Sequence, residues 1–468
     1  MVILDINMEQ ISGFPKNLAY NLKRLQGSII KQKIILNSDR STYAPNDRCM
    51  FNFPIGRMID SRSIVLTAKC IAGTGNHFPR GGLNSLIENL QITANSRVIQ
   101  STQAYNFIWN CLADCSGYFS YEQAPKRIYE NFDPSIAHTN VDGVAAPATT
   151  NACIANTGTD EYYFCVNNWL GFLNSSAPSW DTNNLGQVQM IITFAPNTCM
   201  WLGQAVSAGA TATVANYSIS DIALTMDTIT FTNSLYYDLI KSQLEGGGLN
   251  IAYNDYLLST GSTFTKSSTA TLTHTAQFST NSLDAVIATF RPTTYNTATT
   301  LILSTQGAAT VYTYPEVIAN PLSNEGSHGA FNNSVYFQRA GGGIKSSSWY
   351  INSQPFTVNS SPIQIYNNTL QALDYANLDI ASGGGHSGAI TTGFYNKNYF
   401  LDILSLENLS GDNNNWVSGL GGNGGIIQVQ YNATFSGASS ESTVFPQIIG
   451  RVSKIMNVKI GRNIDIME

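Results

Sequence analysis

The stretch IIQVQYNATF at residues 426–435 alternates apolar and polar side chains along its whole length. The apolar set is Ile427, Val429, Tyr431, Ala433 and Phe435. Successive side chains of a β-strand point to opposite faces of the sheet, so a period of two predicts a strand with one buried and one wet face. Such strands are typical of antiparallel sandwiches.

Three further stretches share this pattern, and each predicts another strand. Their apolar sets are Cys49, Phe51, Phe53 and Ile55; Ile64, Leu66, Ala68 and Cys70; and Val188, Met190, Ile192 and Phe194. In residues 217–231 (YSISDIALTMDTITF) the alternation changes phase, which predicts a β-bulge near Asp227. Glycine clusters and Asn/Ser/Asp runs separate the strands, as in an all-β fold. Helices are predicted only at 9–26, Gln103–Leu112 and Asn368–Tyr375.

A faint internal repeat predicts two copies of one topology. In the first half, a strand turns at Asn95-Ser96, and Tyr105-Asn106 opens an apolar segment shortly afterwards. In the second half, WYINSQPF turns at Asn352-Ser353, and Tyr366-Asn367 follows. A chain of 468 residues is also longer than one core usually supports, so two domains are expected, joined near 232–240.

The chain is poor in charge, since Asp, Glu, Lys and Arg make up 12% against roughly 25% in typical soluble proteins. A surface of Asn, Ser, Thr, Gly and Tyr suits dense protein–protein contact or an extracellular setting. The net charge of −6 gives no global nucleic-acid signal. The basic residues Lys16, Lys23, Arg24, Lys31 and Lys33 nevertheless outnumber the acids in 1–33, and Arg451, Lys454, Lys459 and Arg462 lie near the end. These groups are either ordinary solvated ends or surfaces facing phosphate-rich DNA or lipid.

All seven cysteines lie in the first half and none forms a CxxC pair: Cys49, Cys70, Cys111, Cys115, Cys153, Cys165 and Cys199. We interpret them as buried, reduced thiols from a reducing compartment. Residues 1–11 lack the features of a secretion signal, and no apolar run reaches the ~20 residues that span a bilayer. A protein without such a signal is expected to reach any exterior by another route.

The motif search finds no catalytic, cofactor-binding or metal-binding residues. The five histidines are scattered, and neither HExxH nor GxSxG occurs. GTGNHFPRGG at 73–82 lacks the Gly-Lys-Ser/Thr ending of a phosphate-binding loop. The acids Asp160, Glu161, Asp255, Asp374 and Asp402 are interpreted as solvated loop residues and not as a glycosidase pair. The tryptophans Trp169, Trp180, Trp349 and Trp416 are more typical of cores or interfaces than of a sugar platform.

The order of segments in 28–115 resembles one family. An apolar strand is followed by STYAPNDRCMFNFPI, MIDSRSIVLTAKCIAG and LNSLIENLQITANSRVIQSTQAYNFIWNCLAD. This order is similar to the opening of the first jelly roll in major capsid proteins of the lineage of adenoviruses, tailless phages, virophages and polinton-like viruses. The best local likenesses are Tyr43 with Pro45, Ile59-Asp60, and Asn95 followed by Tyr105. Later matches are the closing strand 217–231, LDAVIATFRP, and SWYINSQPF followed by PIQIYNN. The segments 241–345 and 376–425 match least, and we interpret them as exterior loops.

The resemblance implies two tandem eight-stranded jelly-roll β-sandwiches with a short N-terminal helical arm and long exterior loops. The expected limits are an arm at 1–27, a first jelly roll at 28–235 and a second at 236–468. The implied function is a non-enzymatic viral major capsid protein, forming pseudo-hexagonal homotrimers that tile an icosahedral shell around double-stranded DNA. Expected partners are other copies, penton and minor capsid proteins, and an internal membrane or packaged DNA through the basic arm. Such a protein is made in the host cytoplasm and resides in the virion capsid.

Two other classes of function stay open. A two-domain β-sandwich adhesin or carbohydrate-binding protein would also be rich in Gly, Asn and Thr and poor in charge. A glycan-active enzyme on the same fold is disfavoured by the empty motif search. Fold alone does not separate these classes, because jelly rolls host all three.

Overall fold

The computed structural model describes residues 29–115, 161–202, 214–231, 235–313, 335–375, 400–406, 419–421, 425–436 and 443–467, apart from positions 75, 80, 176, 178, 298, 301 and 307–308. The predicted arm at 1–27 with its helix, Cys153, Asp160 and Trp416 lie outside the described residues.

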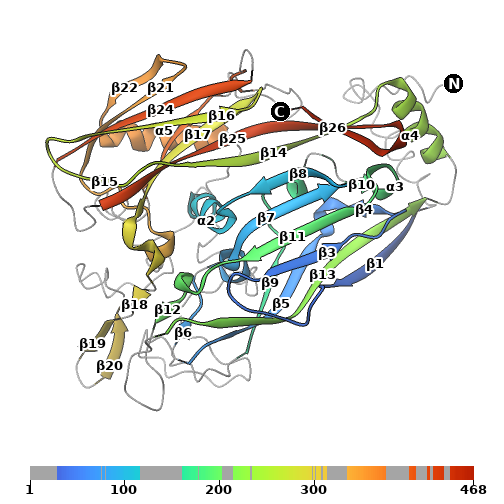
Figure 1. Cartoon of the computed structure of the whole chain (residues 1–468), viewed down its shortest axis with the longest axis horizontal. Coiled ribbons are helices and arrows are strands. Elements are labelled where there is room, and N and C mark those ends of the chain that lie inside the picture. Colours follow the sequence, from blue (N-terminus) through green and yellow to red (C-terminus); the bar gives the residue numbers. More distant parts are fainter. Residues whose placement is uncertain are drawn as a thin grey trace, which may run out of the picture.

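Eight strands in two antiparallel sheets form the first barrel (Figure 1). One sheet has the order β1 (Ile29–Asn37), β13 (Tyr217–Phe231), β5 (Val65–Ala72) and β9 (Glu161–Val166). The other has the order β3 (Arg48–Asn52), β11 (Val188–Phe194), β7 (Ile87–Ala94) and β8 (Arg97–Thr102). Short strands extend the first sheet: β2 (Thr42–Tyr43), β4 (Met58–Asp60) and β10 (Ser179–Asp181).

The second barrel repeats this arrangement strand for strand. One sheet has the order β14 (Leu249–Thr260), β25 (Thr443–Lys459), β17 (Leu283–Pro292) and β23 (Asp402–Ser405). The other has the order β16 (Thr271–Ser279), β24 (Ile426–Phe435), β21 (Ile344–Ile351) and β22 (Gln354–Ser360). The strands β15 (Phe264–Thr265) and β26 (Asn463–Met467) pair with β25. Two eight-stranded jelly rolls with one topology confirm the predicted fold class.

Helices and short strands connect these sheets. The helices are α2 (Tyr105–Cys115), α3 (Thr182–Leu185), α4 (Leu235–Gly246) and α5 (Pro362–Tyr375). The 3-10 turns are Ser61–Ser63, Gly82–Leu86, Gly171–Asn174, Asn197–Cys199, Thr293–Asn296, Val335–Phe337 and Ile460–Arg462. The remaining strands are β6 (Asn76–His77), β12 (Trp201–Leu202), β18 (Thr299–Thr300), β19 (Ile302–Gln306) and β20 (Ala309–Thr313). The two helices predicted at 103–112 and 368–375 are therefore present as α2 and as the second part of α5.

The alternation that predicted the strands is the alternation of burial. In β24 the five apolar residues are all buried, and the same holds for the sets on β5 and β11. Of the set that begins at Cys49, the first three are buried, but Ile55 is 51% exposed because β3 ends at Asn52. The inward faces form two large cores; the second lies within the second barrel, and the first fills the first barrel and extends to residues of β14, β25 and β26. Burying each such side chain contributes about 1.5–3 kcal/mol.

The predicted bulge near Asp227 is wrong. The register of β13 against β5 shifts between Ser220 and Ala223, and Asp221 has a φ of 50°. From there β13 pairs with β1 without interruption through Phe231. Thr228 takes the inward position, and its hydroxyl donates a hydrogen bond of 3.1 Å to the Gln32 carbonyl. A buried threonine at an inward position made the apolar pattern look out of phase.

Residues 249–292 correct the interpretation of 241–345 as exterior loops. They form β14, β16 and β17, three of the eight strands of the second barrel. β14 and β16 fall in the part that matches the family least, whereas β17 is the stretch LDAVIATFRP that already resembled it.

The internal repeat appears as two hairpins of the same geometry. β7 and β8 turn at Asn95-Ser96 with φ values of 47° and 66°, and β21 and β22 turn at Asn352-Ser353 with 48° and 65°. Two consecutive positive φ values define a two-residue turn of type I′, whose twist matches that of the strands. A helix follows each hairpin, α2 in the first barrel and α5 in the second.

The serine in each turn is expected to limit stability. A non-glycine residue in the left-handed region costs roughly 1–2 kcal/mol, whereas glycine adopts it freely at some entropic cost in the unfolded chain. We expect Ser353→Gly to raise the free energy of unfolding by up to about 1 kcal/mol. Thermal unfolding would measure this gain, with Ser353→Ala as the control that keeps a Cβ. Equal stabilities of the glycine and alanine variants would contradict the assignment of the turn.

Asp402 is a buried carboxylate in the core of the second barrel. It accepts hydrogen bonds from the Ser347 hydroxyl (2.6 Å), the Tyr431 hydroxyl (3.0 Å) and the Trp349 indole N–H (3.1 Å). Burial raises the pKa of Asp402 above its usual range, against the lowering by these three donors. The folded chain therefore holds a proton at pH values where the unfolded chain has released it.

This shift predicts a pH dependence of stability with a definite sign. Because the folded pKa is the higher one, the stabilising contribution is complete below the unfolded pKa of ~3.9 and is lost as pH rises through the folded pKa. Between the unfolded and the folded pKa, Asp402 should make the free energy of unfolding fall by up to about 1.4 kcal/mol per pH unit. Asp402→Asn should remove this fall. Urea unfolding of both proteins at a series of pH values measures the difference. Parallel profiles would show that Asp402 does not titrate differently in the two states.

Candidate assembly surface

Within the chain, the second barrel covers an edge strand of the first barrel. β8 is the last strand of its sheet, and strand edges carry unpaired backbone groups. The Tyr253 hydroxyl on β14 donates a hydrogen bond of 2.7 Å to the Ile99 carbonyl on β8. The Thr102 hydroxyl on β8 donates one of 3.1 Å to Asp255 on β14. The β8 edge is therefore closed by β14 side chains.

Helix α2 is buried on both of its sides. Tyr105 and Trp109 face the core of the first barrel. Phe107 and Ile108 face a separate apolar cluster at the junction of the barrels, which includes Ile287 of the second barrel. β17 is consequently buried at every position, on both faces of its sheet. The hairpin-plus-helix unit of the first barrel thus packs on the β14–β25–β17–β23 sheet of the second.

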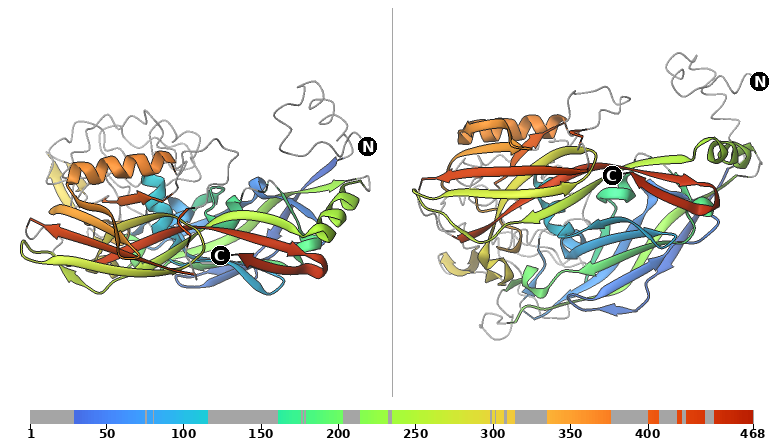
Figure 2. Two further views of the ribbon diagram at one scale, coloured as in Figure 1. Left: turned by 90° about the horizontal axis from the view of Figure 1, so that it is seen from above. Right: turned by 45° about the horizontal axis from the view of Figure 1, so that its top comes forward.

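The equivalent unit of the second barrel is open. β22 is also the last strand of its sheet, and it exposes Phe356 (47%) and Val358 (58%). α5 buries Ile365 but exposes Ile363 (70%) and Tyr366 (45%) at its start. We call these four exposed residues the β22–α5 surface. β22 lies on the side of the second barrel that faces away from the first (Figure 1), whereas α5 lies near α2 of the first barrel (Figure 2), with Ala372 in the junction cluster. A group of exposed apolar residues of this kind marks an interaction site.

A second open edge belongs to the first barrel. β1 occupies in the first barrel the place that β14 occupies in the second, and it exposes Ile30 (58%) and Ile35 (65%). β14 contacts β8 inside the chain. By contrast, no described residue of the second barrel pairs with β1. The contact between the two barrels has two sides: the β8 hairpin with its helix α2, and the edge strand β14. The chain has an exposed equivalent of each side, which is the β22–α5 surface for the first and the β1 edge for the second.

The basic residues near the end of the chain differ in their exposure and in their partners. Lys454 is 7% exposed and lies 3.3 Å from Asp255. Lys459 lies 2.6 Å from Asp465, and this pair lowers the pKa of Asp465. Arg462 donates from Nε to the Asn183 carbonyl at 2.9 Å. Lys454 is therefore a buried structural charge, whereas Lys459 and Arg462 are exposed, and a phosphate-facing role for these two stays a prediction.

Of the acids and tryptophans considered for glycan chemistry, those whose side chains the structure describes are not brought together. Asp255 and Asp402 are buried, which corrects their interpretation as solvated loop acids, and each sits in its own hydrogen-bond network. Glu161 is exposed and pairs with Lys69 at 3.2 Å. Trp169, Trp180 and Trp349 are all buried, so they offer no platform to a sugar.

Among the described residues, no group of three or more His, Cys, Asp and Glu side chains could hold a metal ion. Cys49, Cys70, Cys111 and Cys199 are free, buried thiols, and Cys165 is partly exposed. Burial raises the pKa of Cys49 to about 12, so this thiol is unreactive. Within the part of the chain that the structure describes, no helix is long and apolar enough to cross a membrane.

Comparison with known proteins shows which solved structures share this architecture. No protein-family model and no curated protein sequence matches the chain. The structure of the PBCV-1 virus capsid matches at a TM-score of 0.59 with 13% identity, over 94% of this chain and 97% of that one. The Faustovirus major capsid protein matches at 0.53 with 9% identity, over 92% and 91%. The Sputnik virophage structure matches at 0.53 with 12% identity, over 94% and 88%. The chain thus has the double jelly-roll fold of these capsid structures, as its sequence resemblance implied.

Proposed function

We propose that the chain is a viral major capsid protein whose copies form pseudo-hexagonal homotrimers that tile an icosahedral shell around double-stranded DNA. The observation that carries this proposal is a contact surface that occurs twice in the chain. The surface of β8 and α2 is buried between the two barrels, and the equivalent β22–α5 surface of the second barrel is exposed. The fold shared with virus capsid structures along more than nine-tenths of this chain supports it.

Three chains provide six similar barrels. If the β22–α5 surface of one copy packs on the first barrel of the next, the contact between copies repeats the contact within a copy. A head-to-tail contact of this kind generates either a closed ring or an open filament. Six barrels in a ring close it with three chains, and the near-hexagonal outline packs edge to edge across a flat facet. Each contact should bury more than ~2,000 Å², as obligate interfaces do.

The division of the chain and its partners belong to the same proposal. The arm is 1–27, the first jelly roll 28–235 and the second 236–468. Neighbouring capsomers, penton proteins and minor capsid proteins are the partners. The basic arm lies on the inner side of the shell, against packaged DNA or an internal membrane. The protein is made in the host cytoplasm, has no catalytic role and needs no cofactor.

The mass of the purified protein at low micromolar concentration tests the proposal. Sedimentation should give three chains per particle, and isolated folded chains should be absent. A stable, well-folded monomer would defeat both the trimer and the capsid role. Protease treatment of assembled particles tests the arm separately: it should resist digestion until the particles are opened, and its removal from intact shells would place it outside.

A further inference from the structure

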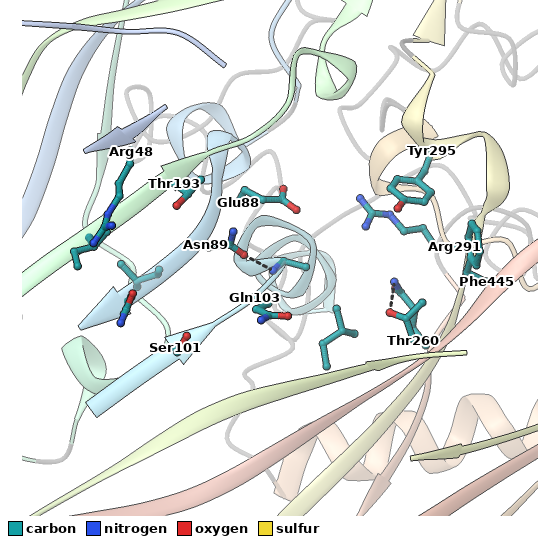
Figure 3. Close-up of a pocket in the computed structure, with 16 residues that line it drawn as sticks. Arg48, Glu88, Asn89, Ser101, Gln103, Thr193, Thr260, Arg291, Tyr295 and Phe445 are labelled. Carbon is teal, nitrogen blue, oxygen red and sulfur yellow. Dashed lines mark hydrogen bonds between the residues drawn. The ribbon is translucent and has the colours of Figure 1, made fainter. Parts of the chain in front are cut away.

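A cavity of about 540 Å³ lies between the β3–β11–β7–β8 sheet of the first barrel and the strands β14, β17 and β25 of the second (Figure 3). Its volume falls in the ~300–1,000 Å³ range of ligand-binding pockets. Most of its lining is polar, and it includes Glu88, Gln103 and Arg291. The β22–α5 surface contributes none of the lining residues.

Two arginines line the cavity, the exposed Arg48 and the buried Arg291. Arg291 is 4% exposed, and its guanidinium carbon lies 3.9 Å from the ring centre of Tyr295, 4.4 Å from Tyr336 and 4.8 Å from Phe107. Nε donates to the Tyr336 carbonyl at 3.2 Å, but Nη2 makes no hydrogen bond. Aromatic rings hold a guanidinium in place, but they do not replace the hydrogen bonds that a buried charge needs.

Glu88 is the matching anion. One of its carboxylate oxygens, Oε2, accepts hydrogen bonds from the Tyr336 hydroxyl and from the Asn106 amide at 2.9 Å. Figure 3 shows the Glu88 carboxylate and the Arg291 guanidinium facing each other across the open middle of the cavity. Glu88 and Arg291 nevertheless form no ion pair within 4.0 Å. The two charges therefore flank a space that neither of them fills.

The pair of opposite charges selects the ligand. A lone anion would pair with Arg291 but be repelled by Glu88. A lone cation would pair with Glu88 but be repelled by Arg291. An amide offers a carbonyl acceptor to the guanidinium and an N–H donor to the carboxylate at once. We propose that the cavity binds an extended, uncharged, Asn- or Gln-containing peptide segment of a partner protein, with its amides between Arg291 and Glu88.

Binding of a defined peptide pool to the full-length protein tests this assignment. The probe is a set of blocked, uncharged tetrapeptides of Gly, Ser, Thr, Asn and Gln, observed by saturation-transfer NMR. We expect binding with a Kd on the order of millimolar, weakened about tenfold by Glu88→Gln. Glu161→Gln is the matched control, because Glu161 is an exposed glutamate outside the cavity and should leave binding unchanged. Gln103→Ala, at an exposed lining residue that folding tolerates, should weaken binding as well.

Three results would overturn the proposal. If no peptide receives saturation from the protein, water alone fills the cavity. Tighter binding of inorganic phosphate than of the peptides would make it an anion site. Equal effects of the Glu88 and Glu161 variants, with Gln103→Ala like wild type, would place the peptides elsewhere on the protein.

Discussion

Replacing Phe356 and Val358 together by aspartate is expected to convert the proposed trimer into monomers. Both residues are on β22 and about half exposed in the single chain, so the fold should tolerate the change. In the assembled state, each aspartate would be an unpaired charge taken out of water, which costs several kcal/mol. Since every 1.4 kcal/mol is tenfold in affinity, two such charges should weaken association by at least about a thousandfold.

Sedimentation of the double variant beside Ile460→Asp provides the measurement and its control. Ile460 is 61% exposed at the turn between β25 and β26, outside the β22–α5 surface, so a charge there should leave the trimer intact. Circular dichroism checks that both variants are folded. A folded double variant that still sediments as a trimer at low micromolar concentration would show that β22 is not in the interface.

Prediction from sequence succeeded where local pattern and tertiary environment agree. The strand at 426–435 alternates because one of its faces meets its own core, and the two Asn-Ser turns are visible because type I′ geometry favours asparagine at the first turn position. The same logic failed at Thr228, which is inward and polar. A hydroxyl that finds a carbonyl acceptor on β1, 196 residues away in the sequence, leaves no trace in the local pattern.

The candidate assembly surface could not be located from sequence at all. β8 and β22 follow the same turn and precede similar helices, and both contain apolar residues. Only the fold shows that Tyr253 closes the β8 edge, whereas Phe356 and Val358 remain exposed. Likewise Asp255 and Lys454 look like ordinary solvated charges, because 199 residues separate the partners that bury each other.

This last pair leads to the second large effect, which is on the stability of the junction between the barrels. Lys454 on β25 and Asp255 on β14 have side chains only 8% and 2% exposed. Asp255 also accepts hydrogen bonds from Thr102 of the first barrel at 3.1 Å and from the Tyr256 amide at 2.8 Å. Removing the cation from such a pair leaves a buried charge without its counterion, which typically costs 3–5 kcal/mol.

Lys454→Met should therefore lower the free energy of unfolding by about 3–5 kcal/mol, whereas Lys459→Met should cost no more than about 1 kcal/mol. The two lysines lie on the same strand, but the Lys459–Asp465 pair is half exposed and screened by solvent. Adding Asp255→Asn to Lys454→Met should restore much of the loss, because the unpaired charge disappears with it. Urea unfolding at one fixed chain concentration measures all four proteins. Equal losses for the two lysine variants would mean that burial at the junction does not strengthen the pair.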